Sequence, residues 1–204
     1  TALARALAIK PRVLLLDEPL AALDAVLRER LRVEIGLLLR EFGITAVYVT
    51  HDQAEAMAIG DRIAVMEKGR IAQIGVPKEI YHRPANDFVA DFVGTMNRIA
   101  GRVENGLLNI HGGETMARLN VGGPDRATTL CFRPEAARLA SANGAISARV
   151  AATTFFGATQ RLVAEVSSEC RLQLDLPSNL SVTPGQILAF EIDPAAIIEF
   201  QTEA

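Results

Sequence analysis

Two strand patterns separated by a long helix pattern constrain the fold of this chain most. Val13–Leu16 is a continuous aliphatic run, and Ile44–Val49 is rich in β-branched residues, as strands are. Between them, apolar residues recur at three- and four-residue spacings along one face of a helix that Gly43 ends: Leu23, Leu27, Leu31, Ile35, Leu38 and Leu39. The order strand, helix, strand predicts an α/β layer with parallel strands.

The rest of the first half continues with short elements. Asp52–Ile59 has the pattern of a short helix. Ile63–Met66 and Arg70–Ile74 predict two strands joined by the tight turn Glu67-Lys68-Gly69. Two short helices follow, and Pro77 opens the first of them.

A change of composition marks the second half. After Gly94 the chain contains no lysine, 9 arginines and 11 acidic residues, and Gly, Pro and Asn separate short alternating segments. Seven of these segments suit strands: Ile99–Val103, Leu107–Ile110, Thr128–Phe132, Ile146–Val150, Gln160–Val166, Arg171–Leu176 and Ile187–Ile192. We therefore expect an α/β domain over residues 1–95 and an all-β barrel or sandwich over residues 96–204, with the boundary near Thr95–Asn97.

The composition argues against several classes of function. With 21 basic and 24 acidic residues the net charge is −3, whereas nucleic-acid binders usually carry a basic excess on one face. The longest stretch without a charged residue, Leu176–Phe190, has 15 residues and two prolines, too few and too polar for a spanning helix. Cys131 and Cys170 are too few for a disulfide framework, which favours a reducing compartment.

Polar side chains follow both predicted strands of the first half. Asp17 and Glu18 come directly after the first strand, and His51 comes shortly after the second. Because the carboxyl ends of parallel strands meet at one edge of a sheet, we expect Glu18 and His51 to lie at the same edge. There the first carboxylate can hold Mg²⁺ through water, the second can act as a general base toward water, and the histidine can contact a terminal phosphate.

Each of these features also has a purely structural explanation. Two acids after a strand can simply be solvated, and a single histidine can flank a helix cap or lie in the core. Asp24, which follows Pro19-Leu-Ala-Ala-Leu23, adds a further acid close to the same edge. The three features in this order and spacing favour a catalytic site over the structural explanations.

Several segments resemble the second half of an ABC-transporter ATPase subunit. Three of them look like the family's Walker B strand, D-loop and switch-histidine loop: Leu14-Leu-Leu-Asp-Glu-Pro19, Ala22-Leu-Asp24 and Val49-Thr-His-Asp-Gln-Ala-Glu-Ala56. Thr1–Leu7 resembles the helix after the family's signature motif, and Gly69–Gly75 and Pro84–Gly94 are similar to the end of the ATPase domain in importer subunits. Cys131-Phe-Arg-Pro-Glu135 and Phe156-Gly-Ala-Thr159 resemble the transport-associated OB-like domain that such importers carry.

This resemblance implies a partial P-loop ATPase domain followed by an OB-like domain. It implies that Asp17 is the Walker B acid associated with Mg²⁺, Glu18 the catalytic base and His51 the switch histidine. Asp24 would be the D-loop acid, which in the family works between two ATPase subunits. Ala22 and its neighbour Ala21 stand in a loop where many relatives carry serine, so the resemblance implies no hydroxyl contribution across that interface.

The resemblance also implies cofactors, partners and a location. The intact protein is expected to use ATP and Mg²⁺ and to hydrolyse ATP as the energy-coupling subunit of an importer. Its expected partners are a second copy of itself, transmembrane permease subunits and, indirectly, an extracytoplasmic solute-binding protein, but no nucleic acid. Its expected place is the cytoplasm, peripheral on the inner face of the cell membrane.

Three motifs of the family do not occur. No Gly-x-x-x-x-Gly-Lys-Ser/Thr stretch is found in the 204 residues, and the glutamine loop and signature motif are absent too. We therefore expect an N-terminally truncated subunit that lacks the phosphate-binding loop and is inactive alone. The alternatives are an ABC ATPase outside transport, such as a translation or DNA-repair factor, and a non-enzymatic regulatory or scaffold protein.

The second half raises three narrower expectations. Arg133 and Glu135 either pair or dock against a neighbouring subunit, or else form a strand-end turn fixed by Pro134. Phe155 and Phe156 are expected in the core rather than on a base-stacking surface. Nothing in this half identifies the solute, although a single short OB-like module inclines the prediction toward non-sugar importers.

Missing neighbours should leave apolar surface in the first half. Leu3, Leu7 and Val13–Leu16 would pack against elements that this chain does not contain. We therefore expect self-association, with the first half mispacked, swapped or shared between chains.

Overall fold

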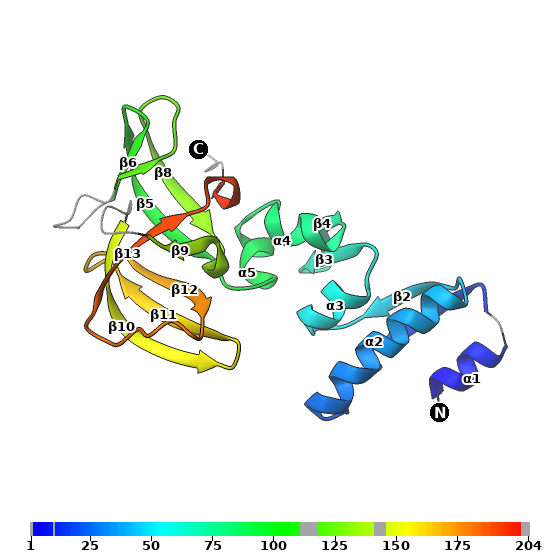
Figure 1. Ribbon diagram of the computed structural model, residues 1–204. Helices are drawn as coiled ribbons and strands as arrows, with labels where there is room; N and C mark the ends of the chain where they lie inside the picture. Colours follow the sequence, from blue (N-terminus) through cyan, green and yellow to red (C-terminus); the bar gives the residue numbers. More distant parts are fainter. Residues whose placement is uncertain (1, 10, 111–117, 141–145, 201–204) are drawn as a thin grey trace. The chain divides into compact units, whose positions relative to one another are not determined.

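The computed structural model describes residues 2–9, 11–110, 118–140 and 146–200. The chain divides into two compact units, Thr1–Gly94 and Thr95–Ala204 (Figure 1). Thr1, the first residue of the predicted opening helix, lies outside the described residues.

The first unit alternates short helices and strands. Its elements are α1 (Ala2–Ala8), β1 (Val13–Asp17), α2 (Ala25–Glu41), β2 (Thr45–Val49), α3 (Gln53–Ile59), β3 (Ile63–Glu67), β4 (Arg70–Gly75), α4 (Pro77–His82) and α5 (Asp87–Phe92). Strands β1 and β2 pair in parallel, from Val13 opposite Thr45 to Asp17 opposite Val49. This is the pairing that the strand–helix–strand order predicts, because a helical crossover returns the chain in the same direction.

The ends of α2 follow from local chemistry. The Asp24 carboxylate accepts a hydrogen bond from the Leu27 backbone N–H at 3.0 Å, which caps the first turn. Leu23, predicted as the first residue of the apolar face, therefore precedes the helix instead of belonging to it. At the other end Gly43 adopts φ +59°, a left-handed conformation that glycine reaches without steric cost.

The remainder of the first unit has a small core of its own. Antiparallel strands β3 and β4 are joined at Lys68 and Gly69, which both have positive φ, as a two-residue hairpin turn requires. The buried side chains of Val65, Ile80 and Val89 pack together beside this hairpin. This cluster anchors helices α4 and α5 to the two strands.

The second unit is all-β. Its strands are β5 (Asn97–Glu104), β6 (Leu107–Ile110), β7 (Arg118–Asn120), β8 (Arg126–Phe132), β9 (Ala137–Leu139), β10 (Ile146–Phe156), β11 (Thr159–Glu165), β12 (Arg171–Pro177), β13 (Ile187–Ile192) and β14 (Ile198–Glu199). They form two five-stranded antiparallel sheets, in the orders β14-β8-β5-β6-β7 and β12-β11-β10-β13-β9. The prediction of a strand-rich second half is confirmed.

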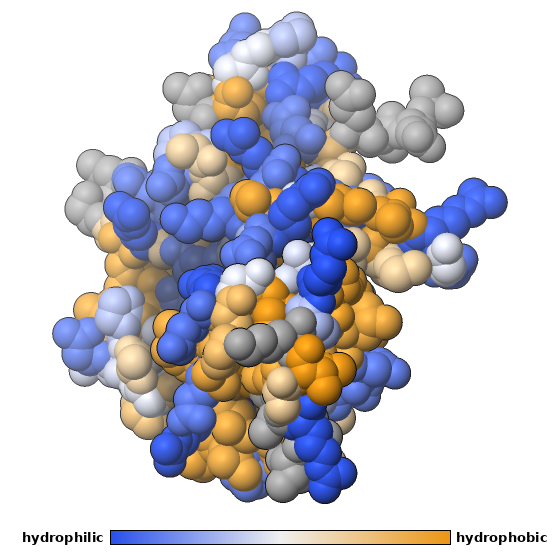
Figure 2. All heavy atoms as spheres, turned by 90° about the vertical axis from the view of Figure 1, so that its right-hand side faces the viewer, coloured by the Kyte–Doolittle hydropathy of each residue, from blue (hydrophilic) through white to orange (hydrophobic). Residues whose placement is uncertain are grey.

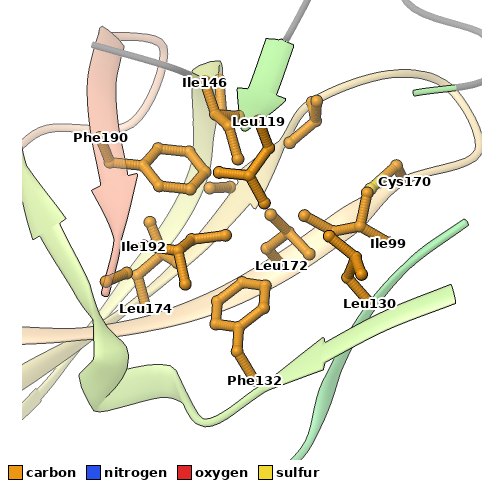
Figure 3. Close-up of a cluster of buried hydrophobic side chains, with 14 of the residues drawn as sticks. Ile99, Leu119, Leu130, Phe132, Ile146, Cys170, Leu172, Leu174, Phe190 and Ile192 are labelled. Atoms are coloured by element: carbon orange, nitrogen blue, oxygen red, sulfur yellow. The ribbon is translucent and has the colours of Figure 1, made fainter. Parts of the chain in front are cut away.

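Both sheets contribute to one hydrophobic core. In the close-up of Figure 3, Ile99, Leu130 and Phe132 from one sheet point toward Leu172 and Phe190 from the other. The strands alternate buried and exposed residues, as in β12, because one face of each sheet packs inward and the other meets solvent.

A buried asparagine joins the two sheets through backbone hydrogen bonds. Asn97, at the start of β5, is 4% exposed. Its side-chain amide donates to the Gln173 carbonyl oxygen, and its side-chain oxygen accepts from the Gln173 N–H, both at 2.7 Å. Asn97 thus makes the two backbone hydrogen bonds that a neighbouring strand would make at the outer edge of β12.

Two expectations for the second half can be compared with the structure. Phe155 and Phe156 are 73% and 61% exposed, so their assignment to the core was wrong. They lie at the end of β10 next to its turn into β11, beyond the inward-facing residues of the strand. Arg133 is buried, donates to the Thr95 carbonyl oxygen at 3.0 Å and precedes a short 3-10 helix, Pro134–Ala136, which fits the strand-end turn.

One face of the parallel pair carries apolar side chains that reach solvent. Leu14 is buried, but its neighbours Val13 and Leu15 are exposed, Leu15 by 74%. Val47 and Val49, which lie opposite Leu15 and Asp17 across the pair, are exposed as well. Figure 2 shows hydrophobic residues on the surface among hydrophilic ones. Apolar residues on one sheet face normally pack against another element.

Loss of the Asn97 bridge should weaken the second unit. Asn97→Ala removes two hydrogen bonds in a buried position, which should lower the free energy of unfolding by about 1–3 kcal/mol. Urea titration of the chain, followed by circular dichroism, measures this change. The matched control is Asn109→Ala, since that side chain makes an exposed contact to Glu104. Equal stability of the two variants would contradict the bridge.

The exposed face of β1 and β2 should drive self-association, as the sequence predicts. Leu15→Lys places a charge in the centre of the face, so the mean mass in static light scattering should fall toward that of a single chain. Ile187→Lys, at a residue 69% exposed in the second unit, is the control and should leave the mass unchanged. A clean monomer for the unchanged chain at micromolar concentration would disprove the prediction.

Candidate active site

The parallel pairing sets the position of every side chain in the candidate site. Asp17 ends β1 opposite Val49, the last residue of β2. The next N–H, that of Glu18, donates to the Val49 carbonyl oxygen at 2.9 Å, so the two strand ends stay in contact one residue beyond the sheet. Glu18 and His51 therefore leave the sheet at the same edge.

Glu18 adopts a backbone conformation that is uncommon for its residue type. Its φ of +43° lies in the left-handed region, which side chains other than glycine occupy at a cost on the order of 1–2 kcal/mol. Such conformations persist where surrounding contacts hold them, and here the hydrogen bond to Val49 does so.

Glu18 and His51 are in direct contact. Nδ1 of His51 lies 2.9 Å from Oε1 of Glu18, and the side chains are 73% and 46% exposed. Because an ionised carboxylate only accepts hydrogen bonds, Nδ1 carries the hydrogen. This hydrogen bond and the negative charge of Glu18 raise the pKa of His51 above its ordinary value of 6.5. The contact thereby favours a protonated ring.

Asp17 and Asp24 stand in different surroundings. The Asp17 side chain is exposed and makes no hydrogen bond or ion pair with the described part of the chain. Asp24 is engaged as the cap of α2. The structure thus brings Glu18 and His51 together, leaves Asp17 open beside them and uses Asp24 to begin a helix.

A buried acid behind the site was not predicted from the sequence. Glu55 on α3 is 3% exposed, and its Oε2 accepts hydrogen bonds from the hydroxyls of Tyr48 at 2.9 Å and Thr50 at 2.8 Å. Burial and the bond to Glu55 raise the pKa of the Tyr48 hydroxyl, so it stays a donor. Glu55 thereby fixes the segment that leads into His51.

Among the residues that the structure describes, no group of three or more His, Cys, Asp and Glu side chains is arranged to hold a metal ion. A single carboxylate such as Asp17 is nevertheless compatible with Mg²⁺, which keeps most of its water and takes few protein ligands. None of the described helices is long and apolar enough to cross a membrane.

The chain is similar to known proteins over most of its length. Residues 130–200 match the family model of the TOBE domain. Over all of this chain, 41% of residues are identical to the spermidine/putrescine import ATP-binding protein PotA of Pseudomonas aeruginosa, and the match covers 59% of that protein. The Fe(3+) ions import ATP-binding protein FbpC of Streptomyces avermitilis is 41% identical over 97% of this chain and 57% of its own length.

A further relative is named for a different solute. The sn-glycerol-3-phosphate import ATP-binding protein UgpC of Vibrio vulnificus is 46% identical over 71% of this chain and 40% of its own length. The chain is thus similar, over most of its length, to ATP-binding subunits of ABC importers, and residues 130–200 match the TOBE domain. It spans a little more than half the length of the first two relatives.

The Glu18 contact can be measured directly. We predict that the His51 ring titrates above pH 6.5 in NMR and that Glu18→Gln lowers its midpoint toward that value, because the amide carries no charge. A raised pKa means that folding favours the protonated ring. The small stabilisation from this exposed contact is therefore complete below pH 6.5 and is lost as the pH rises through the folded-state pKa.

The ring signals of His82, on α4 outside this contact, serve as an internal reference in the same spectra. A His51 midpoint that does not move with Glu18→Gln would disprove the contact.

Proposed function

We propose that this chain supplies the catalytic edge of an ATP-hydrolysing subunit that powers solute import across the cytoplasmic membrane. Residues 1–95 would be the C-terminal portion of its ATPase domain, and residues 96–204 its OB-like regulatory domain. The observation that carries the proposal is the contact between Glu18 and His51 at the carboxyl edge of two parallel strands. The names of the relatives, all import ATP-binding proteins, support it.

The geometry gives each side chain a chemical role. Oε1 of Glu18 accepts from His51, which leaves Oε2 to accept a hydrogen bond from the attacking water and to take its proton. With Nδ1 facing Glu18, Nε2 of His51 is the ring nitrogen that remains for a terminal phosphate. A protonated ring, which the Glu18 charge favours, would donate from Nε2 to a phosphate oxygen.

Asp17 would hold the Mg²⁺ ion through water from its open position at the end of β1. Bound there, the ion would neutralise charge on the phosphates of ATP. The chain itself contributes the Asp17 carboxylate, which no described residue engages and which lies one position before Glu18, the proposed base.

Asp24 is assigned to assembly with a second subunit. In this proposal the loop that Asp24 ends faces a second copy of the subunit. Permease subunits in the membrane receive the movement that ATP hydrolysis drives in the two subunits. A solute-binding protein outside the membrane would act indirectly, and the location would be the inner face of the membrane. Because the relatives' names include a polyamine, ferric iron and glycerol phosphate, we propose a solute other than a sugar.

The 204 residues contain no Gly-rich loop with a following lysine, whose backbone amides and ammonium group hold phosphates in such enzymes. Positioning and charge neutralisation dominate phosphoryl transfer, so a base without that loop has nothing to act on. We therefore propose that this chain alone hydrolyses no ATP.

Mg-ATP hydrolysis tests the proposal in two proteins. The 204-residue chain alone should show no turnover. A fusion that places the unmatched N-terminal part of PotA before residue 1 should hydrolyse ATP, and Glu18→Gln should lower its kcat by about 10²–10⁴-fold. Glu34→Gln, on the exposed face of α2, is the matched control and should keep full activity.

Two results would contradict the proposal. Turnover by the chain alone that Glu18→Gln abolishes would show that the base works without the phosphate loop. Full activity of the fusion with Gln at position 18 would show that Glu18 is not the base.

A further inference from the structure

The contact between Glu18 and His51 needs support from elsewhere in the fold. Both side chains are exposed, and an exposed ion pair is weak because solvent screens the two charges. Each residue also lies in a loop after a strand, where the backbone has few regular hydrogen bonds. The 2.9 Å distance between Nδ1 of His51 and Oε1 of Glu18 is therefore set by the contacts that hold the two loops at a fixed spacing.

One side chain on α2 reaches both loops. Arg28 donates from Nη2 to the Leu23 carbonyl oxygen at 2.9 Å and to that of Ala21 at 3.5 Å, in the loop that follows Glu18. Its Nη1 lies 3.7 Å from Oδ2 of Asp52, the residue after His51. The planar guanidinium suits such a bridge, because its nitrogens point in fixed and different directions.

Asp52 passes this restraint to the residues around His51. Its Oδ1 accepts from the backbone N–H groups of Ala54 and Glu55 at 2.8 and 3.1 Å, which caps α3. Its own N–H donates to the Thr50 hydroxyl at 2.9 Å, and that hydroxyl donates to the buried Glu55. Both neighbours of His51 in the chain are therefore fixed by hydrogen bonds.

The contacts form a closed ring. It runs from Glu18 through the loop to Leu23, across the Arg28 side chain to Asp52, and back through His51 to Glu18. We propose that Arg28 is a positioning residue that holds the loops after β1 and β2 at the spacing where Glu18 and His51 meet. Its importance for hydrolysis rests on the proposed function, but its effect on the contact does not.

Other arginines of α2 lack this arrangement and provide controls. Arg30 pairs with Glu34 at 2.9 Å on the same helix, and both side chains are mostly exposed. In contrast, Arg28 and Asp52 are 31% and 25% exposed, so their contact is partly shielded from solvent. Removal of the Arg30 charge should therefore leave the two loops where they are.

The experiment follows the His51 ring by NMR in the 204-residue chain without nucleotide. Arg28→Met keeps the aliphatic stem and removes the guanidinium, so the loops should separate and the midpoint of the His51 titration should fall. The direct electrostatic effect has the opposite sign, because loss of a nearby positive charge raises a histidine midpoint. Glu18, Asp52 and Glu55 are the acids that act on this ring, and all three stay in place.

Three further measurements make the result decisive. The amide signals of Leu23 and Thr50 should shift in Arg28→Met, whereas Arg30→Met should change neither these signals nor the His51 midpoint. Arg28→Lys keeps the charge but not the two-nitrogen fork, so it should lower the midpoint less than Arg28→Met does. If circular dichroism shows that Arg28→Met unfolds the first unit, the lysine variant decides, since any fall in the midpoint there reflects position alone.

The proposal is overturned if the midpoint of the His51 titration rises or stays constant in Arg28→Met. If the methionine variant unfolds, a constant His51 midpoint in Arg28→Lys overturns it. These readouts contain no ATP, so they are independent of the hydrolysis test. A fall in the midpoint together with an inactive fusion would retain Arg28 as a positioning residue and remove the proposed function.

Discussion

The parallel pairing of β1 and β2 is the constraint on which the candidate site depends. Five residue pairs in register bring both strand ends to one edge, and the hydrogen bond from Glu18 to Val49 extends that alignment by one residue. A slip of one residue would turn each side chain to the opposite face of the sheet. The contact between Glu18 and His51 exists only in the register observed.

The two units are stabilised in different ways. The second unit has a continuous core between two sheets, with Ile99, Phe132 and Phe190 fully buried, and Asn97 ties one sheet to the edge of the other. The first unit has one small cluster beside the β3–β4 hairpin, while its parallel strands expose Leu15 and Val47. Burial of apolar area is the main stabilising contribution in folding, so the second unit has the larger share of it.

The site combines a strained backbone with a network of polar groups behind it. Glu18 occupies a left-handed conformation, and His51 is exposed, yet both are flanked by residues with well-defined partners. Glu55 anchors Thr50, and Asp52 links the start of α3 to Arg28. The chemistry therefore sits on exposed side chains, and its geometry comes from partly buried ones.

Much of this protein can be predicted from its sequence. The aliphatic run Val13–Leu16, the leucine spacing of α2 and the turn at Lys68 and Gly69 are local signals, because each depends on side chains close together along the chain. The acids after β1 and the histidine after β2 likewise follow from strand order alone. This local information suffices for the element order of the first unit, for the parallel pair and for the sheet edge where Glu18 and His51 lie.

Tertiary structure decided the rest. Phe155 and Phe156 face solvent because the end of β10 extends beyond the core. Asn97 bridges the two sheets through hydrogen bonds to a residue 76 positions away in the sequence. Arg28 and Glu55 look like ordinary charged residues of helices until the fold places loops beside them. Contacts between distant residues depend on packing in three dimensions, which no local periodicity encodes.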